Sequence, residues 1–162
     1  MRKTTKYLCI LFVIIIALSF SIKLILKPFI PIIWMKVDDA FHQGNYDIAE
    51  NYLTFISWIE PENPEPYILK GWLQWSHARD LYSLHLPYKN KLNCAVQTYR
   101  KGQKNVPSNW QLYYEEGIMW ESFGEKKKAV KAYYKASELA KKPFSKIYYY
   151  KSKKYNIKVE EK

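Results

Sequence analysis

The side chains that could carry acid–base or metal chemistry are few in this sequence. Its three histidines are His42, His77 and His85. His77 and His85 stand eight residues apart, which puts them on a similar face of one continuous helix, but no carboxylate lies at metal-ligand spacing beside both. The carboxylates of Asp38–Asp39 and of Glu115–Glu116 are adjacent, so on a helix they point in different directions and form no acid–base pair. The sequence predicts no metal site.

Other catalytic patterns are also missing from the sequence. With five glycines in all, the chain has no glycine-rich phosphate loop, and no Ser-His-Asp or Cys-His arrangement is visible. Cys94 is the one cysteine outside the apolar N-terminal stretch, and we interpret it as a small packed residue just before a helix. We therefore expect a protein that is not an enzyme and that binds no cofactor and no small-molecule substrate.

Basic residues gather at the two ends of the chain, whose net charge is +11. Residues 1–27 carry five bases and no acid, residues 141–162 carry eight lysines against two glutamates, and the stretch between them has thirteen bases and thirteen acids. A platform for nucleic acid would carry its bases on the body. The charge pattern therefore argues against nucleic-acid binding by the body of the protein.

The apolar stretch near the N-terminus predicts a membrane anchor. Residues 7–22 contain no charge and follow the basic segment MRKTTK. This run is slightly short for a span, but Lys23 can reach the headgroups while residues 24–26 complete the apolar length. We expect an uncleaved single-span helix within residues 1–27, followed by a membrane-exit linker over 28–32, where the prolines of PFIP break the helix.

Cleavage and orientation of this segment stay open. A signal peptide is the competing interpretation, because Ser19 and Ser21 form a small-x-small pair, although the residues after them remain apolar through Trp34. Bases flank the apolar run on both sides, so the positive-inside rule discriminates little. We expect a single-pass membrane protein with its body on the exported side.

One spacing recurs three times in the body. A small residue is followed by a large apolar residue four positions later and by a small or apolar residue three positions after that, with a proline beyond. The three sets are Ala49, Leu53, Ile56 and Pro61; Ala95, Tyr99, Gly102 and Pro107; and Ala129, Tyr133 and Ala136 with Pro143 two places late. Such a stripe lies on one helix face and is buried only against a neighbour of its own kind. We therefore expect an all-α fold of stacked helical repeats.

These units resemble the tetratricopeptide repeat (TPR), a helix–turn–helix unit. The first unit has Gly44 to close one helix and Tyr46 to pack into the gap, before a helix over about 46–59. The second unit has Tyr67 and Gly71 at the family's aromatic-glycine spacing. Because a mid-helix glycine costs about 1 kcal/mol relative to alanine, we expect a partner helix to approach Gly71 closely.

The resemblance implies a short TPR-like α-solenoid over residues 33–143, behind the one transmembrane helix. Its units are about 33–63, 64–109 and 110–143. The middle unit has twelve residues more than the family pattern, which must lengthen its first helix and form a longer loop around Pro87. The packing positions implied by the resemblance are Gly44, Tyr46, Ala49, Pro61, Tyr67, Gly71, Ala95, Tyr99, Pro107, Tyr113, Gly117, Trp120, Gly124, Ala129, Tyr133 and Ala136.

The basic C-terminal segment, residues 144–162, is interpreted as a capping helix over about 144–154 and a tail, because a terminal repeat must cover its apolar edge. Its tyrosines alternate with lysines, so contact with an anionic membrane surface and stacking on nucleic acid remain alternatives.

The resemblance also implies a concave face built by the first helix of each unit. By helical phase its residues are Trp34, Asp38, His42, Ile68, Trp72, Trp75, Arg79, Gln111, Tyr114, Ile118 and Glu121. Aromatic side chains with a few charges suit a groove that takes an extended or helical peptide. We expect a membrane-anchored scaffold or adaptor that binds a protein or peptide in an envelope complex. The alternatives are a structural subunit packed permanently in a membrane complex and a lipid-binding protein acting through its basic tail.

Overall fold

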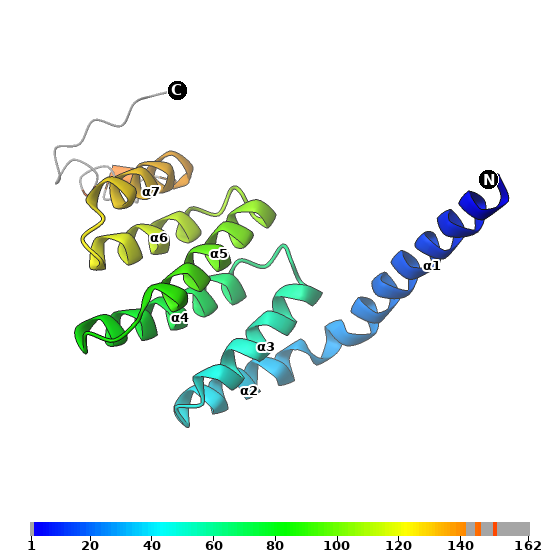
Figure 1. Cartoon of the computed structure of the whole chain (residues 1–162), viewed down its shortest axis with the longest axis horizontal. Coiled ribbons are helices and arrows are strands. Elements are labelled where there is room, and N and C mark those ends of the chain that lie inside the picture. Colours follow the sequence, from blue (N-terminus) through cyan, green and yellow to red (C-terminus); the bar gives the residue numbers. More distant parts are fainter. Residues whose placement is uncertain (1, 142–144, 147–150, 152–162) are drawn as a thin grey trace.

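The chain folds into helices, as expected from the repeated spacing (Figure 1). The computed structural model describes residues 2–141, 145–146 and 151, and these residues contain helices and no strand. The elements are α1 (Arg2–Leu26), the 3-10 turn η1 (Lys27–Phe29), α2 (Ile30–His42), α3 (Tyr46–Ile59), α4 (Glu65–Ser83), α5 (Lys89–Asn105), α6 (Trp110–Ser122) and α7 (Lys126–Leu139).

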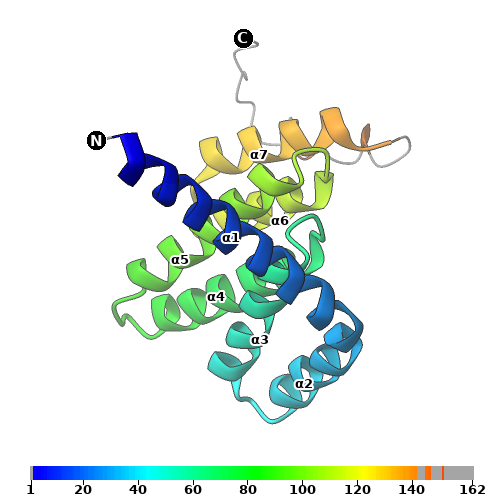
Figure 2. The same cartoon turned by 90° about the vertical axis from the view of Figure 1, so that its right-hand side faces the viewer.

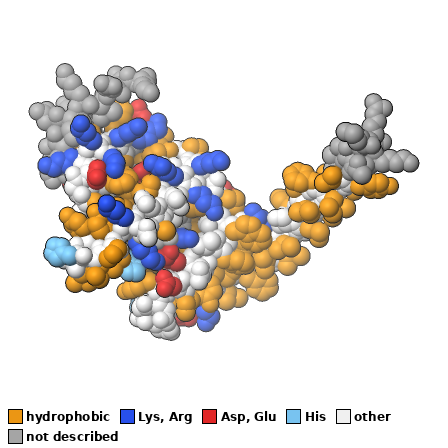
Figure 3. Space-filling view, viewed as in Figure 1, with side chains coloured by type: hydrophobic (Ala, Val, Ile, Leu, Met, Phe, Trp, Pro, Cys, Tyr) orange, Lys and Arg blue, Asp and Glu red, His pale blue; other side chains and the backbone are white. Residues whose placement is uncertain are grey.

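Helix α1 projects away from the other helices as an apolar rod (Figures 1 and 3). The helical run from Ile10 is long and apolar enough to cross a membrane, and none of its apolar window is buried inside the protein. A core helix of a soluble protein would be covered by its neighbours, whereas these side chains are exposed. Helix α1 therefore meets the length and composition of a membrane span, a criterion that a signal sequence also meets.

The helix break expected at the prolines of 28–31 takes the form of a short 3-10 turn between α1 and α2. Pro28 lies in the first turn of η1, and Pro31 lies in the first turn of α2, which begins at Ile30. A proline in a first turn is tolerated because its missing N–H group has no intrahelical partner there. The separate linker over 28–32 is thus replaced by a three-residue turn, and the chain stays helical from α1 into α2.

Helices α2 to α7 form three hairpins that lie side by side in chain order (Figures 1 and 2). The turns of the first hairpin, α2–α3, and of the third, α6–α7, contain Gly44 and Gly124 with φ of +72° and +73°. Glycine adopts this left-handed conformation without steric cost, so it ends the first helix of each pair. The second hairpin, α4–α5, has the long first helix of 19 residues and the loop containing Pro87 that its extra residues predict.

The repeated stripe forms the seams of these hairpins. All nine of its helical positions are buried: Ala49, Leu53, Ile56, Ala95, Tyr99, Gly102, Ala129, Tyr133 and Ala136. All of them except Gly102 belong to an apolar cluster centred on the first hairpin, a larger one spanning α4 to α7, or a small one at the end of α7. Helix α4 contributes to the first two of these clusters. Its Leu73 belongs to the cluster of the first hairpin, and its Tyr67 belongs to the cluster that spans α4 to α7.

Two glycines in the first helices make room for a tyrosine of the second helices. A Cβ atom on Gly71 would lie 2.6 Å from Cζ of Tyr99, and one on Gly117 would lie 2.5 Å from Cε1 of Tyr133. The expected close approach of a partner helix at Gly71 is confirmed. In the first hairpin, Val37 takes the place of the glycine and Leu53 takes the place of the tyrosine. The larger side chain on the first helix is thus matched by a smaller one on the second helix.

Polar side chains also connect the first hairpin to the second. The amide Nε2 of Gln74 donates to Oε2 of Glu50 at 2.7 Å, and the hydroxyl of Thr98 donates to Oε1 of Gln74 at 2.8 Å. Gln74 is itself buried, so both of these hydrogen bonds satisfy polar groups that water reaches poorly. The chain of bonds runs from α3 through α4 to α5.

Two packing predictions are wrong. Tyr46 is 50% exposed and meets only the edge of the Phe41 ring among the aromatic contacts described, instead of filling the gap between helices. Cys94 is exposed and lies within α5, whose first residue is Lys89. Helical phase places Ala95, one residue later, on the buried side of α5, and this turns Cys94 outward.

The remaining packing positions vary in burial. Tyr67 and Trp120 are buried, Tyr113 and Pro61 are half-buried, and Pro107 is exposed in the turn after α5. Most of the capping helix expected over 144–154 and the tail after it lie outside the described residues.

Candidate functional site

The face predicted to bind a partner comes from α2, α4 and α6. Helix α4 is the middle element, since it packs against α3, α5 and α6 and reaches α2 through the Phe41–Trp72 ring contact. Sequence phase alone assigned eleven residues to this face. Their exposure and contacts divide them into an exposed group, a packed group and a group that the C-terminal segment contacts.

An aromatic contact joins the first two hairpins on this face. The rings of Phe41 on α2 and Trp72 on α4 stack with centroids 5.8 Å apart and planes 25° apart. The ring of Tyr46 makes a T-shaped contact with Phe41, with centroids 5.7 Å apart. Trp72 keeps 38% of its surface exposed. The Phe41–Trp72 stack therefore presents an apolar surface, held in place by a ring contact between two hairpins.

Charged side chains lie on the same two helices as the Phe41–Trp72 stack. On α2, Nδ1 of His42 lies 3.4 Å from Oδ1 of Asp38 and 2.9 Å from the Asp38 carbonyl oxygen. On α4, the Arg79 guanidinium lies 5.4 Å from the ring centroid of Trp75. Asp38, His42 and Arg79 are exposed, so the two helices that carry the stack also present charged groups to solvent. The fifth exposed residue of the predicted set is Gln111.

Trp75 is not a surface residue, so its assignment to the binding face is wrong. Only 5% of Trp75 is exposed, and it belongs to the core cluster with Tyr99, Met119 and Trp120. The reason is that α6 packs on this side of α4 and widens the buried arc beyond the stripe facing α5. Trp34, Ile68 and Ile118 are half-buried and pack against the apolar clusters.

Lys151, near the C-terminus, contacts residues that the third hairpin contributes to this face. The Lys151 ammonium lies 3.8 Å from Oε2 of Glu121 and 5.2 and 5.0 Å from the ring centroids of Tyr114 and Tyr133. Glu121 also accepts a hydrogen bond from the Tyr133 hydroxyl. Two of the predicted partner residues, Tyr114 and Glu121, thus already have contacts within the chain.

Two polar atoms are buried beneath this face. Neither Nε1 of Trp75 nor the Tyr99 hydroxyl has a hydrogen-bond partner within the part of the chain that the structure describes. Burial raises the pKa of Tyr99 well above its usual value, the nearby Glu115 carboxylate raises it further, and the neighbouring Trp75 indole acts the other way. Tyr99 is therefore neutral in the folded protein and serves packing, as its repeat position predicts.

Glu115 on α6 makes the stability of the protein depend on pH. Burial raises its pKa, and the Lys151 ammonium partly opposes this. A carboxyl group whose pKa is higher in the folded than in the unfolded chain favours folding at low pH, and this contribution is lost as the pH rises through the folded pKa. We expect Glu115→Gln to raise the urea midpoint at neutral pH and to flatten its fall as the pH rises above the usual glutamate pKa of about 4.3. The exposed Glu62→Gln is the matched control, and equal pH profiles for the Glu115→Gln and native chains would contradict the prediction.

A cavity of about 330 Å³ lies at the loop between α4 and α5. Residues 85–90 line it, and His85 within that loop has a φ of +58°. The cavity is lined by this loop and the first two residues of α5, and it is open to solvent. Within the described residues no group of three or more His, Cys, Asp or Glu side chains could hold a metal ion. His77 and His85 are therefore not brought together with further ligands.

Sequence reasoning missed Phe41, the residue that joins Trp72 to the first hairpin. The signal was present in the spacing, because positions 34, 38 and 41 lie on one side of a helix as well as 34, 38 and 42 do. It also missed Phe55 and Trp58 on α3, whose rings are 6.0 Å apart and exposed. A search limited to the first helix of each unit could not include them.

Neither the protein-family models nor the curated proteins compared with this chain match it, so the residues of the chain itself carry the argument for its function.

Proposed function

We propose that this protein is a membrane-anchored adaptor whose helical hairpins hold a protein or peptide partner near the bilayer. The observation that carries the proposal is the Phe41–Trp72 stack, in which two hairpins hold the exposed Trp72 ring against the half-buried Phe41 ring. A large aromatic surface that is already fixed in place loses little entropy on binding. Aromatic side chains held in place in this way often contribute most of the binding energy at the centre of a protein interface.

The arrangement of the hairpins supports a TPR-like solenoid. The buried stripe recurs in all three hairpins, and the Gly71–Tyr99 and Gly117–Tyr133 contacts repeat one packing solution in two of them. In a repeat array each unit contacts its neighbours and together they present a continuous face. The face of this solenoid is the one formed by α2, α4 and α6.

The proposed partner segment is a peptide with an apolar anchor residue and flanking polar groups. Its apolar side chain covers Trp72, and its polar groups meet Asp38 and His42 on one side and Arg79 on the other. Because Lys151 contacts Tyr114 and Glu121, binding is centred on the first two hairpins. The proposed role involves no catalytic chemistry and no cofactor.

Removal of the Trp72 side chain is the direct test. Truncation of a central interface aromatic costs about 2 kcal/mol or more, which is roughly thirtyfold in affinity. We expect the full-length Trp72→Ala chain, purified from detergent-extracted native membranes, to lose crosslinked partners that the native chain retains. Ile48→Ala, at an exposed apolar residue on α3, is the control and should retain them. Unchanged partners with Trp72→Ala would remove this face from the proposal and favour a structural subunit that packs elsewhere.

A further inference from the structure

The C-terminal end of α3 lies beside the base of α1. Helix α2 continues α1 across η1, and α3 runs back along α2, so the last turn of α3 returns to the point where α1 leaves the body (Figure 1). Two contacts hold it there. The Lys23 ammonium lies 5.1 Å from the Trp58 ring centroid, and the Lys27 ammonium lies 3.9 Å from Oε1 of Glu60.

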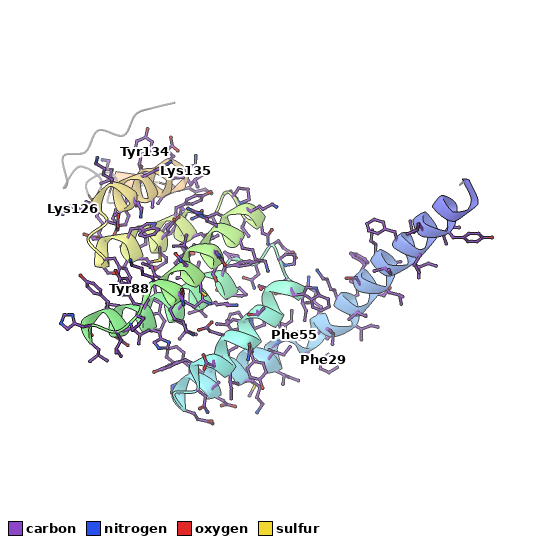
Figure 4. All side chains as sticks on the ribbon, viewed as in Figure 1. Phe29, Phe55, Tyr88, Lys126, Tyr134 and Lys135 are labelled. Carbon is purple, nitrogen blue, oxygen red and sulfur yellow. The ribbon has the colours of Figure 1, made fainter. Side chains whose placement is uncertain are left out.

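Three aromatic rings are exposed at this junction. Phe29 on η1 is 53% exposed, and Phe55 and Trp58 on α3 are 37% and 40% exposed. Figure 4 shows Phe29 and Phe55 on the elements that meet at the base of α1. The Phe55 and Trp58 rings are 6.0 Å apart. We call Phe29, Phe55 and Trp58 the aromatic collar.

The level of the aromatic collar follows from Lys23. This lysine is the first charge after the uncharged run 7–22, so in a membrane-spanning α1 its ammonium marks the headgroup level at that end. Trp58 packs against this ammonium and therefore lies at the same level. Tryptophan is stabilised at that depth, because its ring leaves water while its indole N–H stays hydrated, and the neighbouring Phe rings are stabilised by leaving water.

From this geometry we infer that the aromatic collar lies in the headgroup region of the bilayer that α1 crosses. Phospholipid is the molecule that contacts the aromatic collar, because the collar continues the exposed apolar surface of α1. The contact with α3 adds a second attachment point, so the first hairpin is held at a set depth instead of swinging about η1. The inference rests on the membrane span of the proposed function.

Tyr46 provides a matched control on the same helix. It is 50% exposed and aromatic like Trp58, but it begins α3 whereas Trp58 is near its end. Twelve residues of helix separate them by about 18 Å, which exceeds half the thickness of the hydrocarbon core of a bilayer. If the collar lies at the membrane surface, Tyr46 lies in water.

The test places one environment-sensitive fluorophore at a time on the full chain. In a background with Cys9→Ser and Cys94→Ser, single cysteines replace Ile14, Tyr46, Phe55 or Trp58, so two of the three collar residues remain in each collar variant. Each labelled chain is reconstituted into phosphatidylcholine vesicles containing lipids brominated near the headgroup or near the chain end. Circular dichroism of each variant verifies its helical fold.

We expect shallow brominated lipid to quench the labels at 55 and 58 at least about twofold more than the label at 46, and deep brominated lipid to quench the label at 14. Quenching at 14 with equal, low quenching at 46, 55 and 58 would overturn the aromatic collar while leaving the anchor in place, and would indicate a protein partner on this surface. No quenching at 14 would overturn the anchor, and the collar with it.

Discussion

Replacing Gly117 with alanine is expected to lower the free energy of unfolding by about 1 kcal/mol. The new Cβ would lie 2.5 Å from Cε1 and 2.6 Å from Cδ1 of Tyr133, a ring that is fully buried and whose hydroxyl bonds to Glu121. Overpacking of this kind costs about 1–3 kcal/mol, and the better helix propensity of alanine returns about 1 kcal/mol of it. The steric term is larger because a buried ring cannot move aside.

A double substitution separates this contact from a general effect on α6. In the first hairpin Val37 is matched by Leu53, so Gly117→Ala should be tolerated better in a chain that also carries Tyr133→Leu. Urea unfolding of the full chain in detergent, followed by circular dichroism, gives both single variants and the pair. Gly71→Ala should behave like Gly117→Ala, since its Cβ would lie 2.6 Å from Cζ of Tyr99. A Gly117→Ala chain as stable as the native one would contradict the packing described.

Two arginines in α1 are expected to abolish membrane attachment. Ile15 and Leu18 are exposed on α1, and each arginine near the middle of a span costs about 2.5–3.5 kcal/mol of insertion free energy. The double variant therefore loses about 5–7 kcal/mol, which is enough to leave the chain outside the bilayer. Cell-free synthesis with membrane vesicles followed by an alkaline wash measures the fraction that stays in the pellet.

The matched control places the same two charges on the body. Ile48 and Leu69 are exposed on α3 and α4, and arginine there should leave the pelleted fraction unchanged. The mass of the pelleted native chain distinguishes an anchor from a signal peptide, because an anchor retains its first residues and a signal peptide does not. Persistent pelleting of the Ile15→Arg, Leu18→Arg chain would show that α1 is not what attaches the protein to the membrane.

Much of the helical fold was readable from side-chain size and spacing. The stripe that begins at Ala49 predicted which side of α3 is buried, and Gly44 predicted where α2 ends. Both features act within one helix or one turn, where periodicity and backbone sterics decide the outcome. The close approach at Gly71 was also predictable, since a glycine inside a helix is unfavourable without such a contact.

The binding face was predicted less well, and Trp75 shows why. Helical phase places Trp72 and Trp75 on one side of α4, yet Trp72 is exposed and Trp75 is buried. The difference arises because α6 covers one edge of that side, and the width of a buried arc depends on how neighbouring helices pack. Periodicity within one helix contains no information on this width.

By itself, the sequence determined the all-α class, the apolar helix at the N-terminus and the seams at Ala49, Tyr99 and Tyr133, because each depends on residues a few positions apart. Only the tertiary structure decided that Phe41 stacks on Trp72, that Lys151 reaches Glu121 and that Trp58 lies beside Lys23. These pairs are separated by between 30 and 35 residues. Their contacts follow from how whole hairpins dock, and that is set by the sum of many packing contacts distributed over several helices.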